Sequence, residues 1–151
     1  MKRFILPALL HVGLLLPVLA QQPAPAPAAE ALPQPKITVF VNNRPWQNEK
    51  SFPEGYIKQI AFRAVLDSAS LQTFSHLERD LLVRKATISI AKGNRRVASM
   101  VWQPGASILS LASEARSGDR FVIEVSEVAA RDKAGATRRL PATQVFSIPV
   151  N

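Results

Sequence analysis

The chain contains no cysteine among its 151 residues. This absence excludes zinc–thiolate sites, cysteine nucleophiles and disulfides. It also excludes lipidation at the cleavage site of an exported precursor, because that modification needs a cysteine. A domain of about this size buries roughly two-thirds of the surface that its unfolded chain exposes. We therefore expect the fold to rest on its apolar core alone, without covalent or metal cross-links.

Residues that carry catalysis are also scarce. His76 is the only histidine outside the first 20 residues, and a lone histidine without a partner is usually a surface residue. The sequence has no G-x-S-x-G motif and no glycine-rich loop between a strand and a helix. Glu124 and Glu127 are three apart on a predicted strand, so they should face opposite sides. We expect no enzyme, no cofactor and no metal site.

The first 20 residues resemble a secretory signal peptide. Lys2 and Arg3 precede an apolar run, and the small residues Val18 and Ala20 stand before Gln21. An uncleaved membrane anchor is the alternative, but the run is short and contains two prolines. We expect a periplasmic or secreted protein that is not a lipoprotein and keeps no membrane span after cleavage.

The rest of the chain divides by composition. Residues 21–35 are rich in proline and alanine, which favours an extended linker. Residues 36–151 have the length of one domain. Removal of Lys2 and Arg3 lowers the net charge from +8 to +6. A basic chain often binds nucleic acid, but export argues against that partner and favours an acidic protein or an anionic envelope polymer.

The first part of the domain gives mixed signals. Residues 37–41 are β-branched or aromatic and precede the turn residues 42–45, which predicts a strand and a turn. Residues 56–66 fit both a helical face and a strand face, and we expect one turn of helix followed by a strand. The spacing of Leu71, Phe74 and Leu77 fits a short helix or a wrapped loop.

Two hairpins are clearer. Alternating residues on both sides of the Gly93-Asn94 turn predict a hairpin over residues 82–102. Residues 121–125 and 146–150 alternate in the same way and predict a second hairpin, with a turn at residues 132–135. Between the hairpins, the apolar spacing of residues 106–116 predicts one short helix, with Ser107 as N-cap and Gly118 after its end. Short strands with one clear helix indicate an antiparallel β-sandwich.

The basic residues beside the two hairpin turns are the best candidate for a functional site. Arginine there could bind carboxylates or phosphates with two hydrogen bonds. If both tips lie at the same end of the sandwich, their side chains form one interaction patch. The alternative is that the charges only keep the tips soluble and discourage edge pairing. The candidate residues are Lys92, Arg95, Arg96, Arg131, Lys133, Arg138 and Arg139.

The order of motifs over residues 51–150 resembles the C-terminal domain of the GldM/PorM family. The most specific part runs from Gly118-Asp119 through an apolar strand to Asp132-x-x-Gly135, then Arg138-Arg139-Leu140-Pro141 and a final Phe146-x-Ile148 strand. The resemblance implies an Ig-like fold and a link to gliding motility and type IX secretion in Bacteroidetes. It also implies an envelope protein partner, such as a ring component at the outer membrane, and leaves a homodimer open.

The sequence therefore predicts a non-enzymatic periplasmic module that docks to another protein by strand addition or charge complementarity. The alternative is a binding module for an anionic envelope polymer, lipopolysaccharide or cell-wall glycan. Binding to such a polymer would weaken steeply with salt, because exposed charges are screened.

Overall fold

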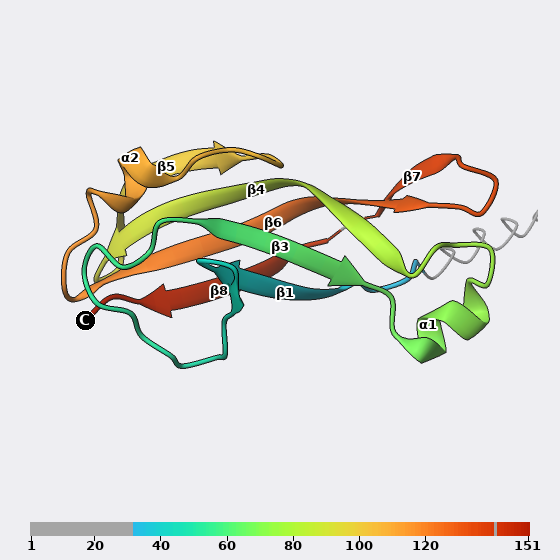
Figure 1. The fold of residues 1–151 in the computed structure, drawn as a ribbon, viewed down its shortest axis with the longest axis horizontal. Coiled ribbons are helices and arrows are strands. Elements are labelled where there is room, and N and C mark those ends of the chain that lie inside the picture. The colour runs from blue at the N-terminus through green and yellow to red at the C-terminus, as the bar shows by residue number, and fades with distance from the viewer. Residues whose placement is uncertain (1–31, 141) are drawn as a thin grey trace, which may run out of the picture. The chain divides into compact units, whose positions relative to one another are not determined.

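The computed structural model describes residues 32–140 and 142–151. The predicted signal peptide, most of the predicted linker and Pro141 of the Arg-Arg-Leu-Pro motif lie outside these residues. Figure 1 shows the order of the elements along the chain. They are β1 (Lys36–Val41), β2 (Arg44–Pro45), β3 (Ile60–Val65), α1 (Ser68–Thr73), β4 (Asp80–Lys92), β5 (Arg95–Trp102), α2 (Leu109–Ala112), β6 (Asp119–Arg131), β7 (Thr137–Leu140) and β8 (Gln144–Pro149).

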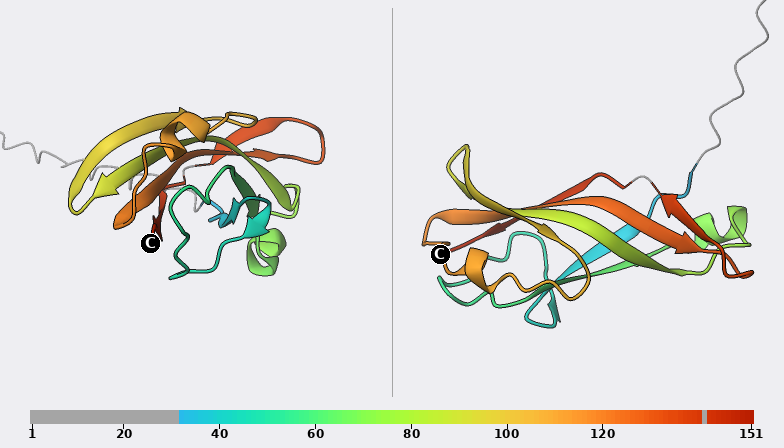
Figure 2. Two further views of the ribbon diagram at one scale, coloured as in Figure 1. Left: turned by 60° about the vertical axis from the view of Figure 1, so that its left-hand side comes forward. Right: turned by 90° about the horizontal axis from the view of Figure 1, so that it is seen from above.

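The strands form two antiparallel layers that share β4. One layer has the order β2-β1-β3, and the other has the order β5-β4-β6-β8. The start of β4 pairs with β3 through Asp80 and Leu81, and its later part pairs with β5. Figure 2 shows the two layers from two sides. The predicted mainly-β, Ig-like sandwich is confirmed.

The core lies between the layers and follows the alternation in the sequence. Every second residue of β1 (Ile37, Val39, Val41) and of the first half of β6 (Phe121, Ile123, Val125) is buried. Both sets belong to one continuous cluster of buried residues. Trp102 also faces this core and meets Phe62 edge-on, with ring centroids 4.5 Å apart. Burial of these apolar faces supplies the main driving force for folding.

Two opposed bulges interrupt the pairing of β4 with β6. Val83 pairs with Val128 and Ala86 pairs with Val125, so that Arg84 and Ser126 are each the extra residue of a bulge. Each bulge shifts the inward face by one position. Glu124 and Glu127 therefore both lie on the outer face, where each is only partly buried and bonds an arginine. Our expectation that they face opposite sides is wrong, because it assumed an uninterrupted strand.

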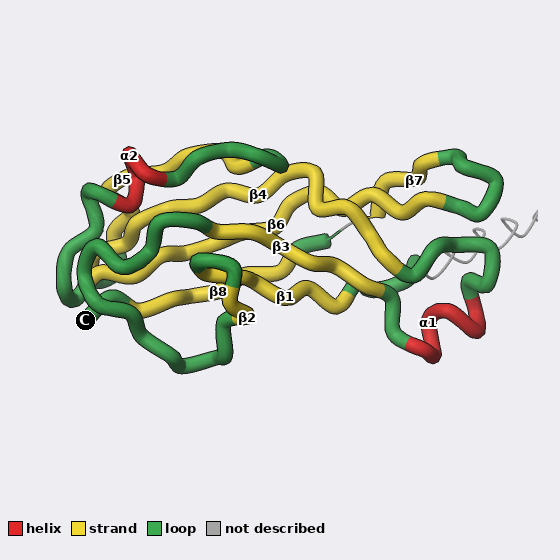
Figure 3. Tube along the Cα trace, viewed as in Figure 1, coloured by secondary structure: helices red, strands yellow, loops and turns green. Residues whose placement is uncertain are grey.

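The helices differ from expectation in position and length. Figure 3 shows them at opposite ends of the sandwich. Leu71 lies in α1, so the short helix is right there and the wrapped loop is not. Residues 56–59, where we expected a turn of helix, form no helix and lead directly into β3. α2 is shorter than predicted, and its N-cap is Ile108 instead of Ser107. Gly118, with φ of +89°, serves the turn before β6 and does not end the helix.

The last residues of the predicted linker pack against the domain. Pro33 and Pro35 are buried, and the Gln144 side-chain amide donates a 2.6 Å hydrogen bond to the carbonyl of Pro35. The folded region therefore includes these residues, although their composition suggested a solvated tether.

Candidate interaction surface

The two basic hairpin tips lie at opposite ends of the sandwich. Lys92, where β4 ends, is opposite Asp119, where β6 begins. The two strands run antiparallel, so the turn that follows β4 and the turn that follows β6 point in opposite directions (Figure 1). The seven candidate residues therefore form two groups of three and four, and the condition for one joint patch, both tips at the same end, is not met.

The tip between β4 and β5 carries Lys92, Arg95 and Arg96. These residues and Val97 line a shallow hollow of about 440 Å³. Arg96 reaches across the outer face to Glu124, with a nitrogen–oxygen distance of 2.7 Å. Both side chains remain partly exposed, so the pair contributes about 0–1 kcal/mol to stability. The pair also neutralises part of the charge at this tip.

The tip between β6 and β7 carries Arg131, Lys133, Arg138 and Arg139, all exposed. The Asp132 carboxylate accepts a 2.8 Å hydrogen bond from the Ala136 N–H and closes the turn. The Lys133 N–H donates to the carbonyl of His76 at 2.9 Å, which ties the tip to the loop before β4. Only Arg139 of the four forms an ion pair among the described residues, with Glu127 at 3.6 Å. This tip presents three cations without an ion pair among the described residues, on a hairpin bonded to the loop before β4.

A hollow of about 350 Å³ lies beside this tip, at the point where β4 leaves β6. Regular pairing between the two strands ends at Leu82 and Ala129, while Leu81 and Asp80 turn to β3. Contact with β6 returns only at Glu78, whose N–H donates to the Arg131 carbonyl at 2.8 Å. The shared strand β4 thus opens a gap between two strands that pair along the rest of their length.

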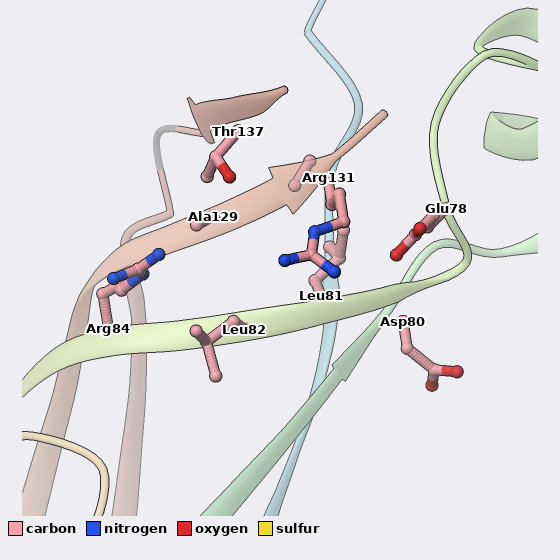
Figure 4. Close-up of a pocket in the computed structure, with 9 residues that line it drawn as sticks. Glu78, Asp80, Leu81, Leu82, Arg84, Ala129, Arg131 and Thr137 are labelled. Carbon is pink, nitrogen blue, oxygen red and sulfur yellow. The ribbon is translucent and has the colours of Figure 1, made fainter. Parts of the chain in front are cut away.

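Figure 4 shows Arg84 and Arg131 facing one another across this hollow. Arg131 stands out in the sequence as a residue of the hairpin tip, whereas Arg84 was not among the predicted site residues. Arg84 is the extra residue of the β4 bulge, and bulges commonly redirect a side chain. Two polar residues in succession, Arg84 and Lys85, follow three apolar residues in succession, 81–83, and this departure from strict alternation is the signal that could have revealed the bulge.

Other kinds of site have little support in the part of the chain that the structure describes. Its His, Asp and Glu residues form no group of three or more that could hold a metal ion. No helix within residues 32–140 and 142–151 is long and apolar enough to cross a membrane. The pKa of the Asp67 carboxyl is lowered by a hydrogen bond from the Ser70 backbone N–H, which is a helix-capping contact. His76 lies exposed in the loop before β4.

Comparison with known families agrees with the motif order and the fold. The model of the GldM C-terminal domain matches residues 33–151. The chain belongs to the GldM C-terminal domain family. This membership relates it to gliding motility and type IX secretion, and the match begins at the buried Pro33. No curated protein matches the chain significantly. No solved structure does so either.

Proposed function

We propose that this protein is a non-enzymatic periplasmic interaction module, accessory to gliding motility or type IX secretion. Family membership supports the setting. The observation that carries the proposal is the tip between β6 and β7, where Arg131, Lys133 and Arg138 are exposed and form no ion pair with any described residue. A hairpin tip with unpaired cations suits a partner with a complementary acidic surface.

The partner that fits this surface is an acidic envelope protein, with an outer-membrane-associated ring component as our first candidate. A second copy of the chain is less well matched, because its own tips are basic. An anionic polymer is also less well supported. The basic residues are divided between two ends, and Arg96 and Arg139 are already paired with glutamates.

Site-specific cross-linking in cells tests the proposal. A photoreactive amino acid replaces Lys133 in one chain and Lys92, at the opposite tip, in another. We expect position 133 to cross-link to a gliding or type IX secretion component. In the chain with the photoreactive residue at position 133, the charge reversal Arg131→Glu with Arg138→Glu should reduce that product about tenfold or more, because truncating or reversing close charge pairs at interfaces typically costs several kcal/mol.

The matched control is Lys92→Glu with Arg95→Glu, which changes the net charge equally. Equal losses from both pairs of reversals would show that net charge, and not this tip, governs capture. A product made of lipopolysaccharide or glycan, with binding lost at moderate salt, would favour the polymer alternative.

A further inference from the structure

The hollow between β4 and β6 has an apolar floor and two cationic walls. Leu82 and Ala129 are opposite one another in the strand pairing and form the floor. Leu82 keeps 48% of its surface exposed, at the point where the pairing of β4 with β6 ends. Arg84 and Arg131 stand on either side of this floor (Figure 4). The hollow therefore combines apolar contact area with positive charge.

No carboxylate among the described residues is paired with either of the two arginines, although that of Glu78 points toward Arg131 (Figure 4). The nearby Asp80 carboxylate points away from the hollow in Figure 4 and bonds Arg63 at 3.4 Å instead. Like charges that face each other across a cavity repel, and an anion placed between them would relieve that repulsion. A guanidinium group also binds a carboxylate with two parallel hydrogen bonds.

We propose that this hollow binds an aspartate or glutamate side chain from an extended segment of a partner protein. The carboxylate would lie between Arg84 and Arg131, and an apolar neighbour in the segment would cover Leu82. This inference deepens the proposed function and rests on it, because it names the chemistry by which the module recognises its partner.

A phosphate-bearing polymer fits this hollow less well. Glu78 lines one wall, and its carboxylate points toward Arg131 in Figure 4. A doubly charged phosphate would be repelled by that carboxylate more strongly than a singly charged side chain would. The exposed Leu82 also has no role in binding a hydrophilic polymer, whereas it suits a peptide that carries apolar and acidic residues together.

Nuclear magnetic resonance titration of the isotope-labelled chain tests the proposal. The probe is the end-capped peptide Ser-Val-Asp-Leu-Ser-Gly, and its control carries Asn in place of Asp. We expect saturable shifts of the Arg84 and Arg131 side-chain N–H signals and of the Leu82 methyl signals. Arg84→Gln with Arg131→Gln should weaken binding about tenfold or more, because hydrogen bonds to charged groups are among the stronger ones.

The control variant, Lys92→Gln with Arg95→Gln, removes the same charge at the other tip and should retain the affinity within about twofold, since distant sites act independently. The proposal is overturned if the Asn peptide binds equally well, or if both double variants lose affinity equally. Inorganic phosphate that shifts the same signals while the Asp peptide shifts none would also overturn it and mark a phosphate site.

The two proposals fail separately. If the Asp peptide does not bind the hollow but position 133 still cross-links to an envelope protein, the assignment of the hollow is wrong and the interaction module stands. If the peptide binds as expected but no cross-link forms at position 133, the hollow is confirmed and the proposed docking tip is wrong.

Discussion

At the scale of single residues, Asn42 joins the β1–β2 turn to the loop that leads into β3. Its side chain donates to the Tyr56 carbonyl at 2.7 Å and accepts from the N–H groups of Lys58 and Gln59 at 2.8 and 3.0 Å. Its φ of +49° lies in the left-handed region. Asn42→Ala should therefore lower the free energy of unfolding by roughly 2–3 kcal/mol in urea denaturation.

Asn43 provides the control for this prediction. Asn43 has a similar φ of +64°, but its side chain forms no hydrogen bond with a described residue. Asn43→Ala should cost only the backbone strain, about 1 kcal/mol. Equal losses for the two variants would mean that the three hydrogen bonds of Asn42 contribute nothing net.

Asp67 gives a pH-dependent contribution at the start of α1. Its carboxylate accepts a 2.7 Å hydrogen bond from the Ser70 N–H, and this bond lowers the pKa of the carboxyl. A lowered folded-state pKa means that the stabilisation is present at neutral pH and is lost as pH falls through that pKa. Asp67→Ala should destabilise the fold at pH 7 and matter less in acid.

Denaturation midpoints of Asp67→Ala and the unsubstituted chain, measured between neutral and acid pH, check this expectation. Asp67→Asn should keep most of the cap, since asparagine is also a favoured N-cap residue, but without the pH dependence. A gap between Asp67→Ala and the unsubstituted chain that stays constant into acid would contradict the assignment.

At the scale of elements, β7 contributes little to the core. Leu140 is its only buried residue, whereas β6 buries residues along its whole length. Local opening is easiest where few apolar contacts are lost. In hydrogen exchange, the amides that join β7 to β6 should exchange at least about a hundredfold faster than those between β4 and β6. Equal protection would show that the hairpin opens only with the whole domain.

The number of buried side chains in each strand also explains which strands could be predicted from the sequence. The alternation in residues 86–90 and 121–125 predicted β4 and β6 correctly, because apolar side chains recur there at every second position. β7 was missed, since the four residues Thr-Arg-Arg-Leu contain a single apolar side chain. The second hairpin therefore involves two strands, β7 and β8, that pair in succession with β6.

The arrangement of the site was harder to predict than its residues. Arg131 and the other basic tip residues stand out in the sequence, but their grouping depends on which strands are neighbours. β4 and β6 pair directly although β5 and α2 separate them along the chain. Local patterns do not report such pairing. For the same reason, nothing in the sequence placed Arg84 opposite Arg131.

At the scale of the whole domain, the residues just before β1 should contribute to stability. Pro33 and Pro35 are buried, and Pro35 bonds Gln144 of β8. A chain that starts at Lys36 should unfold with roughly 1–3 kcal/mol less free energy than one that starts at Leu32, because it loses this apolar burial. Thermal and urea denaturation measure the difference. Equal stability would place the domain boundary at the start of β1 instead.

The start of β1 and the end of β8 lie at opposite ends of the sandwich, and this placement determines how the domain carries a pulling force. β1 begins at the end of the sandwich near Asp80, and β8 ends at the opposite end, where Pro149 pairs with Arg120 (Figure 1). A force that pulls Leu32 away from Asn151 would act along β1 and shear its six residue pairs with β3 simultaneously. Bonds loaded together resist a pull far better than bonds that open one at a time. The domain can therefore transmit tension from end to end while it presents its basic tip.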